Sequence, residues 1–297
     1  MAIAESAVVE GIGVLFGTIG ITVNSLYAVE SVSALVVLFY RFLFACPALL
    51  IWLLLQRQKR RQRLEPKTWL LMAGIGVVQA VSQLCYFEAI GEIGIALATV
   101  ITICVAPVLV ALLSIVWFRE ALSLPVLLSL LLSIVGIVLI SGIDNAHPGV
   151  SQRGSVTALI SALSFVLVFL FGRMLTGRVD AVQSSFISVV CATVLLLPFV
   201  RETAFDLELP LSMWLRLVYP GVITTALAYW LLMSGMRVVN ATVASILTLV
   251  DPMVAALLAY VFAGEHWRNR ELLGGMLLML AFVTIAVGSK KVIVADK

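Results

Sequence analysis

The stretch from Ala106 to Glu120 reads APVLVALLSIVWFRE, and the stretch from Asp251 to Glu265 reads DPMVAALLAYVFAGE. Each has a proline in second place, then an apolar run, then a glutamate thirteen residues after the proline. The two stretches lie 145 residues apart, and Tyr86 and Tyr229 match at a spacing of 143. Similarity at a nearly constant spacing indicates that the 297-residue chain consists of two related halves.

The composition places both halves in a membrane. The chain is 62% hydrophobic and 12% charged, with a mean hydropathy of +1.16, whereas soluble domains carry about 25% charged residues. These values exclude a soluble protein and indicate one membrane-embedded bundle. The net charge of +3 does not indicate a nucleic-acid partner, because membrane topology accounts for the basic residues.

Ten segments are long and apolar enough to span a bilayer, which takes about 20 residues as a helix. Their apolar runs are continuous and do not alternate, so they predict helices and not barrel strands. The predicted spans are 8–28, 33–55, 69–90, 94–117, 122–142, 154–173, 182–200, 212–235, 241–262 and 271–289.

Lysine and arginine residues set the predicted orientation. The loop from Gln56 to Lys67 holds six of them, so this loop is expected in the cytoplasm. Counting spans from it places both termini in the cytoplasm, with thirteen basic residues on the inner side and five on the outer side.

An odd number of spans per half inverts the second half. Residues 1–145 and 146–297 are therefore predicted to form two five-helix repeats of opposite topology, related by a pseudo-two-fold axis in the membrane plane. Such a pair has two conformations of similar energy, one open to each side of the membrane. This is a physical basis for alternating access. We expect a central cavity between the two repeats.

The chain resembles the drug/metabolite transporter superfamily in its ten-helix, EamA-type branch, over residues 8–290. The residues that carry the resemblance are Arg41 in Phe39-Tyr40-Arg41-Phe42, Tyr86-Phe87 with Ala89, the segments 107–120 and 252–265, and Gly136 with Gly142. The resemblance implies a cavity bounded by helices 1, 3, 4, 6, 8 and 9, with helices 5 and 10 in support. It also implies export of amino acids, metabolites or drugs across the bacterial inner membrane, with aromatic amino-acid exporters as one kind.

The third predicted span carries a polar stripe. Gln79, Gln83 and Tyr86 are spaced at i, i+4 and i+7, which places them on one face of a helix. Because polar groups find no water in lipid, this face should point into the bundle. It either hydrogen-bonds a polar solute or joins neighbouring helices through bonds of about 0.6–2 kcal/mol each.

The eighth predicted span offers Thr225 and Tyr229, and Tyr229 is the repeat partner of Tyr86. Two symmetric tyrosines could hold an aromatic solute between them, or each could simply pack in the core. Hydroxyls on other spans could contact solute or bond back to their own helix. The further solute-binding candidates are Asn24, Thr99, Thr102, Ser164, Phe165 and Thr248.

Asp251 is predicted near the middle of the ninth span, directly before Pro252. A carboxylate at that depth is a candidate proton carrier, although it could also bond the helical turn that the proline breaks. The first half has Ala106 at the matching place, so a proton site would be asymmetric. Structural roles are assigned to Arg41, Pro107, Pro252, Glu120 and Glu265.

Several classes of function lack their signatures. No glycine-rich loop with Lys-Ser/Thr is present, and His147 and His266 have no partners at metal-ligand spacing. We therefore expect no cofactor, no metal and no enzymatic activity. A sensor would need an output domain that the short loops do not provide, and a channel fits inverted repeats less well.

The sequence as a whole predicts an all-α integral membrane protein that exports small organic solutes, with amino acids and especially aromatic ones first. A multidrug or other metabolite exporter is the alternative, and a membrane-embedded enzyme or sensor is the alternative of another class. The expected partners are a small-molecule solute and membrane lipid, and the chain is a monomer or a homodimer.

Overall fold

The computed structural model describes residues 33–56, 64–119, 123–141, 151–204, 211–237, 239–249, 254 and 269–295. All regular structure in these ranges is helical. The helices, with two π-helical segments labelled η, are α2 (Ala34–Leu55), α3 (Pro66–Thr99), η1 (Val100–Cys104), α4 (Val105–Phe118), α5 (Leu124–Ser141), α6 (Gln152–Leu175), α7 (Ala181–Ala204), α8 (Leu211–Gly221), η3 (Val222–Leu227), α9 (Ala228–Gly235), α10 (Ala241–Leu247) and α12 (Asn269–Ala295).

Each described helix overlaps at least one of the predicted spans. Among the described residues, six helices are long and apolar enough to cross a membrane. Shorter apolar stretches lie in α5 and α12, at Leu124–Leu139 and Leu272–Ala281. The predicted span 8–28 and most of span 241–262 lie outside the described residues. The protein is thus an all-α membrane protein, as the hydropathy predicts.

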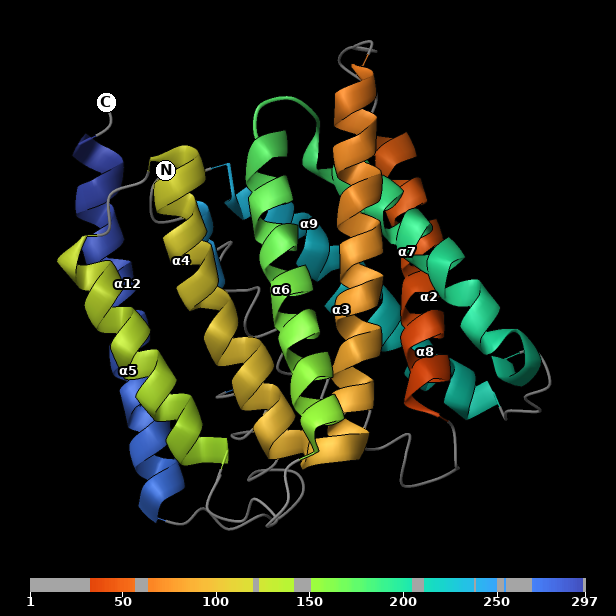
Figure 1. Ribbon diagram of the computed structural model, residues 1–297. Helices are drawn as coiled ribbons and strands as arrows, with labels where there is room; N and C mark the ends of the chain where they lie inside the picture. Colours follow the sequence, from red (N-terminus) through yellow and green to blue (C-terminus); the bar gives the residue numbers. More distant parts are fainter. Residues whose placement is uncertain are drawn as a thin grey trace.

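The turn between the third and fourth spans differs from its prediction. The predicted spans 69–90 and 94–117 leave residues 91–93 as a short connection, but these residues are helical and the break falls at Gly94, whose φ is 81°. A positive φ is strained for side-chain-bearing residues and easy for glycine. The chain therefore reverses around Gly94, and α4 runs back antiparallel to α3 (Figure 1).

Helix contacts follow the inverted symmetry. Helix α2 packs on α7, α4 packs on α10, and α5 packs on α12, which are contacts between corresponding helices of the two halves. Helix α3 contacts α7, and the corresponding α8 contacts α2. Figure 1 shows α2 and α7, and likewise α5 and α12, running in opposite directions. Exchanging the halves maps these contacts onto each other, which an inverted repeat requires.

Two glycines permit close approach between the halves. A Cβ on Gly76 of α3 would lie 2.2 Å from the carbonyl oxygen of Ser188 on α7. A Cβ on Gly221 of α8 would lie 2.5 Å from the Cβ of Phe44 on α2. Small residues at such crossings are the usual means of packing membrane helices.

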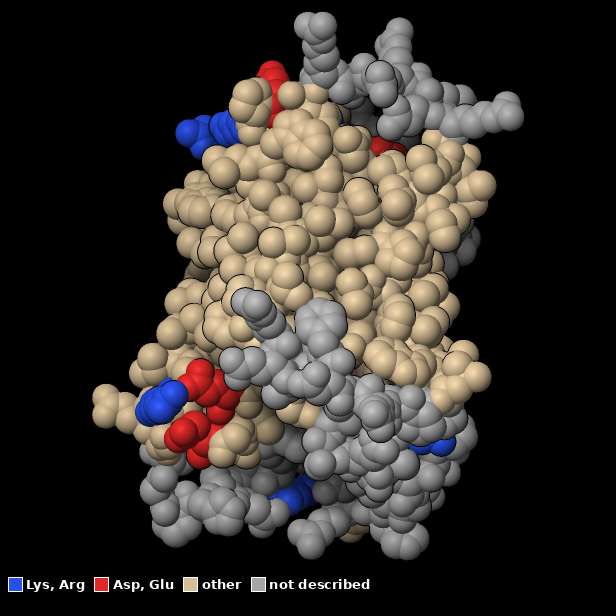
Figure 2. Space-filling view, turned by 90° about the vertical axis from the view of Figure 1, so that its right-hand side faces the viewer, with Lys and Arg blue, Asp and Glu red and all other residues tan. Residues whose placement is uncertain are grey.

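The outer surface matches a bilayer environment. Charged side chains gather at the two ends of the molecule, and a broad uncharged band separates them (Figure 2). Large apolar side chains are exposed on the helices, among them Leu70, Val116 and Met276 with exposed fractions of 74%, 72% and 65%. Helix α2 ends, and α3 begins, at the end of the molecule where α12 also finishes (Figure 1).

Candidate solute site

The inner face of α3 is defined by its neighbours. Gly76 packs against α7, and Ser82 bonds to Ser161 of α6. Residues three positions away lie about 60° to either side on a helix, so Gln79 points between these two contacts. Leu70 and Val77, on the opposite side of α3, are 74% and 43% exposed. The predicted polar stripe therefore faces the bundle interior.

Gln79 has an unusual environment for an amide. Its side chain is 3% exposed, and neither its nitrogen nor its oxygen has a hydrogen-bond partner among the described residues. An unpaired amide buried in an apolar environment costs roughly 1–3 kcal/mol. A polar ligand that accepted from the nitrogen and donated to the oxygen would remove this cost.

A pair of serines fixes α3 against α6 one turn away from Gln79. The Ser82 hydroxyl donates to the carbonyl of Ser161 at 3.0 Å, and the Ser161 hydroxyl donates to the carbonyl of Ser82 at 2.7 Å. The antiparallel register of these helices then places Ser164, which is buried, near the level of Gln79. Sequence reasoning did not single out Ser82, because serines in spans usually bond only to their own helix.

Tyr86 continues the stripe toward the Gly94 turn. Its hydroxyl lies 2.7 Å from the Thr99 hydroxyl, so these two predicted residues are joined by a direct hydrogen bond. Thr102 is buried and its hydroxyl lies 3.5 Å from the carbonyl of Ala158 on α6. The structure thus brings Tyr86, Thr99 and Thr102 to one region between α3, η1 and α6.

In the described part of the chain, two π-helical segments interrupt the spans, each near a proline. Segment η1 ends three residues before Pro107, and η3 begins two residues after Pro220. Proline has no N–H to donate, so it releases a carbonyl in the preceding turn, and π-segments are frequent at functional sites. The hydroxyls of Thr224 and Thr225 both donate to the carbonyl of Pro220 at 2.8 Å. Thr225 is therefore bonded within its own helix.

Tyr229 lies in the second half, on α9, and is 7% exposed. Its ring centroid is 6.4 Å from that of Phe42 on α2. Arg41, also buried, is near enough to interact electrostatically with the Tyr229 hydroxyl. The structural role predicted for Arg41 is compatible with this position inside the bundle.

The other predicted residues fall into two groups. Gln83 and Phe165 are partly buried, Phe165 packs edge-on against Phe169, and the Thr248 hydroxyl donates to the carbonyl of Ser245. The residues that lie outside the described part of the chain are Asn24, Glu120, Asp251, Pro252 and Glu265.

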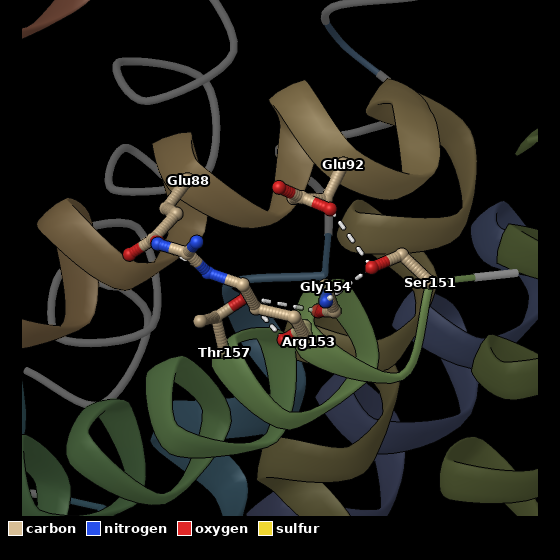
Figure 3. Close-up of polar contacts among 6 residues, drawn as sticks. All are labelled: Glu88, Glu92, Ser151, Arg153, Gly154 and Thr157. Atoms are coloured by element: carbon tan, nitrogen blue, oxygen red, sulfur yellow. Dashed lines mark hydrogen bonds and ion pairs between the residues drawn. The ribbon is translucent and has the colours of Figure 1, made fainter.

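A polar cluster closes the α3–α6 contact at the end near Gly94 (Figure 3). Arg153 donates to Glu88 through Nε at 3.1 Å, and the Ser151 hydroxyl donates to Glu92 at 2.8 Å. Ser151 also caps α6 by accepting from the N–H of Gly154. Arg153 and Glu88 are 73% and 42% exposed, so this cluster is a solvated clamp outside the interior stripe.

The described residues contain no group of three His, Cys, Asp or Glu side chains that could hold a metal ion. The interior stripe instead offers amide, phenol and hydroxyl groups, which suit recognition of a polar organic molecule by hydrogen bonding.

Comparison with known proteins assigns the family. The model of the EamA-like transporter family matches twice, over residues 8–142 and 152–287. The chain belongs to the EamA-like transporter family. The protein is therefore a membrane transporter, and its solute is a small molecule.

Individual relatives agree with this assignment. An uncharacterized transporter of Bacillus subtilis, YwfM, is 27% identical over 93% of this EamA-like transporter and 91% of its own length. An uncharacterized inner membrane transporter of Salmonella typhimurium, YicL, is 22% identical over 94% of this chain and 93% of its own length. A crystal structure with 16% sequence identity matches with a TM-score of 0.81, covering 95% of this chain and 98% of its own. At that identity the likeness shows the fold alone.

Proposed function

We propose that this EamA-like transporter exports small organic solutes by alternating access, with amino acids as the solute class and aromatic ones preferred. The solute binds against the inner face of α3, where Gln79, Gln83 and Tyr86 meet residues of the second half. The inverted contacts between the halves support the alternating-access part of the proposal, because they allow two equivalent states of opposite orientation.

The observation that carries the proposal is the buried amide of Gln79. A side chain with both hydrogen-bonding atoms unsatisfied is costly, and such costs are tolerated at functional sites. An amino acid offers a carboxylate to accept from the amide nitrogen and an ammonium group to donate to the amide oxygen. A purely apolar drug would leave the amide nitrogen and oxygen of Gln79 without hydrogen bonds.

The preference for aromatic solutes rests on the two repeat-related tyrosines. Tyr86 belongs to α3 and Tyr229 to α9, so each half would offer one tyrosine ring to an aromatic solute. Aromatic contacts contribute about 0.5–1.5 kcal/mol beyond simple burial. Thr99 and Thr102 lie next to Tyr86 and provide further hydroxyls for the polar part of the solute.

We place the protein in the bacterial inner membrane with both termini in the cytoplasm. The basic loop from Gln56 to Lys67 supports this orientation, and the relative from Salmonella is named as an inner membrane transporter. Asp251, in the second half, is the candidate proton carrier that couples export to a pH gradient.

The proposal is tested by counterflow in proteoliposomes with radiolabelled tryptophan, phenylalanine and alanine, and with ethidium as a drug-like cation. We expect tryptophan and phenylalanine to exchange fastest, and Tyr86→Ala and Tyr229→Ala to slow them. Val77→Ala, on the outward face of α3, is the matched control and should leave exchange unchanged.

Absence of amino-acid exchange by folded protein, together with no effect of either tyrosine substitution, would remove the proposal. Ethidium transport without amino-acid exchange would instead favour a multidrug exporter.

A further inference from the structure

A groove lies on the outer surface between the first turns of α3 and the first half of α7. Its volume is about 550 Å³, which is within the range of small-molecule sites. Residues from both helices line it, including Pro66, Trp69, Leu70 and Ala73 of α3 and Phe186 and Val190 of α7.

The groove is separate from the solute site. Leu70 points away from Gln79 on α3, and it is 74% exposed, while Trp69 is 50% exposed. The lining side chains are apolar apart from the thiol of Cys191. The lining residues belong to the membrane spans Pro66–Gly94 and Ala181–Val200, so the molecules available to fill the groove are lipid tails.

A basic residue directly follows Pro66, which lines the groove. Pro66 is the first residue of α3, and exposed Lys67 follows it directly. The chain from Gln56 to Lys67 carries six basic residues and one acidic residue, Glu65. Each basic residue near a membrane surface attracts anionic lipid by about 1 kcal/mol, which corresponds to about fivefold in affinity. The charge therefore complements an anionic headgroup.

We propose that this groove binds an anionic phospholipid, with one acyl chain between α3 and α7 and the headgroup beside Lys67. Because α3 belongs to the first half and α7 to the second, the lipid contacts both halves at once. It therefore stabilises one relative arrangement of the halves. The site does not depend on which solute the protein carries.

The test is native mass spectrometry of the purified full-length protein titrated with phosphatidylglycerol or with phosphatidylcholine of the same acyl chains. We expect phosphatidylglycerol to be retained preferentially by the wild type. Ala73→Trp fills the groove and should abolish this retention, and Lys67→Gln should weaken phosphatidylglycerol about fivefold without affecting phosphatidylcholine.

Val135→Trp adds the same ring to an outward position of α5, which is 50% exposed, and should behave as the wild type. If Ala73→Trp does not fold, Ala73→Leu serves as the smaller filling variant. Equal retention of both lipids by the wild type would overturn the proposal, and so would unchanged phosphatidylglycerol retention in a folded groove-filling variant.

Discussion

Two tyrosine–threonine pairs occupy repeat-related positions and differ in their hydrogen bonding. Tyr86 and Thr99 in the first half correspond to Tyr229 and Thr242 in the second, both at a spacing of 143. The Tyr86 and Thr99 hydroxyls are bonded at 2.7 Å. The Thr242 hydroxyl is buried with no partner among the described residues, while the Tyr229 ring packs near Phe42.

The difference shows that related residues of the two halves take non-equivalent arrangements in one structure. In an inverted repeat the two pairs lie toward opposite membrane faces. The bond between Tyr86 and Thr99 has no counterpart at the Thr242 hydroxyl among the described residues. Alternating access predicts that the pairs exchange these arrangements, with Tyr229 and Thr242 bonded in the opposite state.

The largest expected effect is on flux driven by a pH gradient, and it concerns Asp251, whose counterpart in the first half is not acidic. Asp251 precedes Pro252, whereas Ala106 precedes Pro107. Asp251→Asn should abolish flux driven by a pH gradient, because an amide cannot carry the proton, while counterflow without a gradient persists. The measurement is tryptophan uptake into proteoliposomes with and without an imposed gradient. Unchanged gradient-driven flux would assign Asp251 to the structural role.

The next effect concerns Gln79, whose repeat-related position holds Val222. Gln79→Leu should raise thermal stability, because it removes a buried amide that has no partner among the described residues, and such an amide costs roughly 1–3 kcal/mol. The same change should lower the exchange rate at subsaturating solute by roughly tenfold or more, since the solute loses its hydrogen bonds. Val222→Leu is the control in the other half and should change exchange little.

Stability and exchange are to be measured on the same preparations of these two variants. A Gln79→Leu protein that is less stable than the wild type and exchanges solute normally would show that the amide supports the bundle and not the solute.

The tyrosine–threonine comparison is sharpened by identical substitutions in both halves. Thr99→Val breaks the bond with Tyr86 and should destabilise the protein by about 0.6–2 kcal/mol. Thr242→Val removes a hydroxyl for which the described part of the chain offers no partner, and it should be neutral or stabilising. Thermal unfolding in the same detergent compares them. Equal destabilisation by both substitutions would contradict the asymmetry between the halves.

The smallest effect is expected at the exposed clamp of Glu88 and Arg153. Because both side chains are largely solvated, Glu88→Gln and Arg153→Gln should change unfolding temperature only slightly, and salt should reduce the change further. Exchange rates should stay at the wild-type value. A large loss of exchange in either variant would place this clamp within the transport cycle.

The spans and the inner face of α3 could be predicted from the sequence because both follow from where polar groups are tolerated in lipid. Gln79 and Tyr86 point inward for that reason. The break at Gly94 was misplaced by one to three residues, since residues 91–93 are helix-compatible and only the backbone conformation decides the turn. The π-helical segments η1 and η3 could not be predicted, because they depend on which hydrogen bonds form around the prolines once neighbouring helices have packed.

Hydroxyl partners were the least predictable part of the candidate site. Thr99 bonds to Tyr86 across the break at Gly94, whereas Thr225 bonds to the carbonyl of Pro220 within its own span. Both are threonines in apolar surroundings, and only the local geometry separates them. Ser82 was missed for the same reason, because its partner Ser161 lies 79 residues away.

The most direct test of the account is thiol accessibility along α3. In a variant without Cys46, Cys85, Cys104 and Cys191, single cysteines at Gln79, Gln83 and Tyr86 are compared with one at Val77. Membrane-impermeant and permeant aqueous thiol reagents are applied with and without tryptophan. The account predicts labelling at the three inner positions that tryptophan slows, and no aqueous labelling at Val77. Labelling of Val77 with the inner positions unreactive in both states would contradict it.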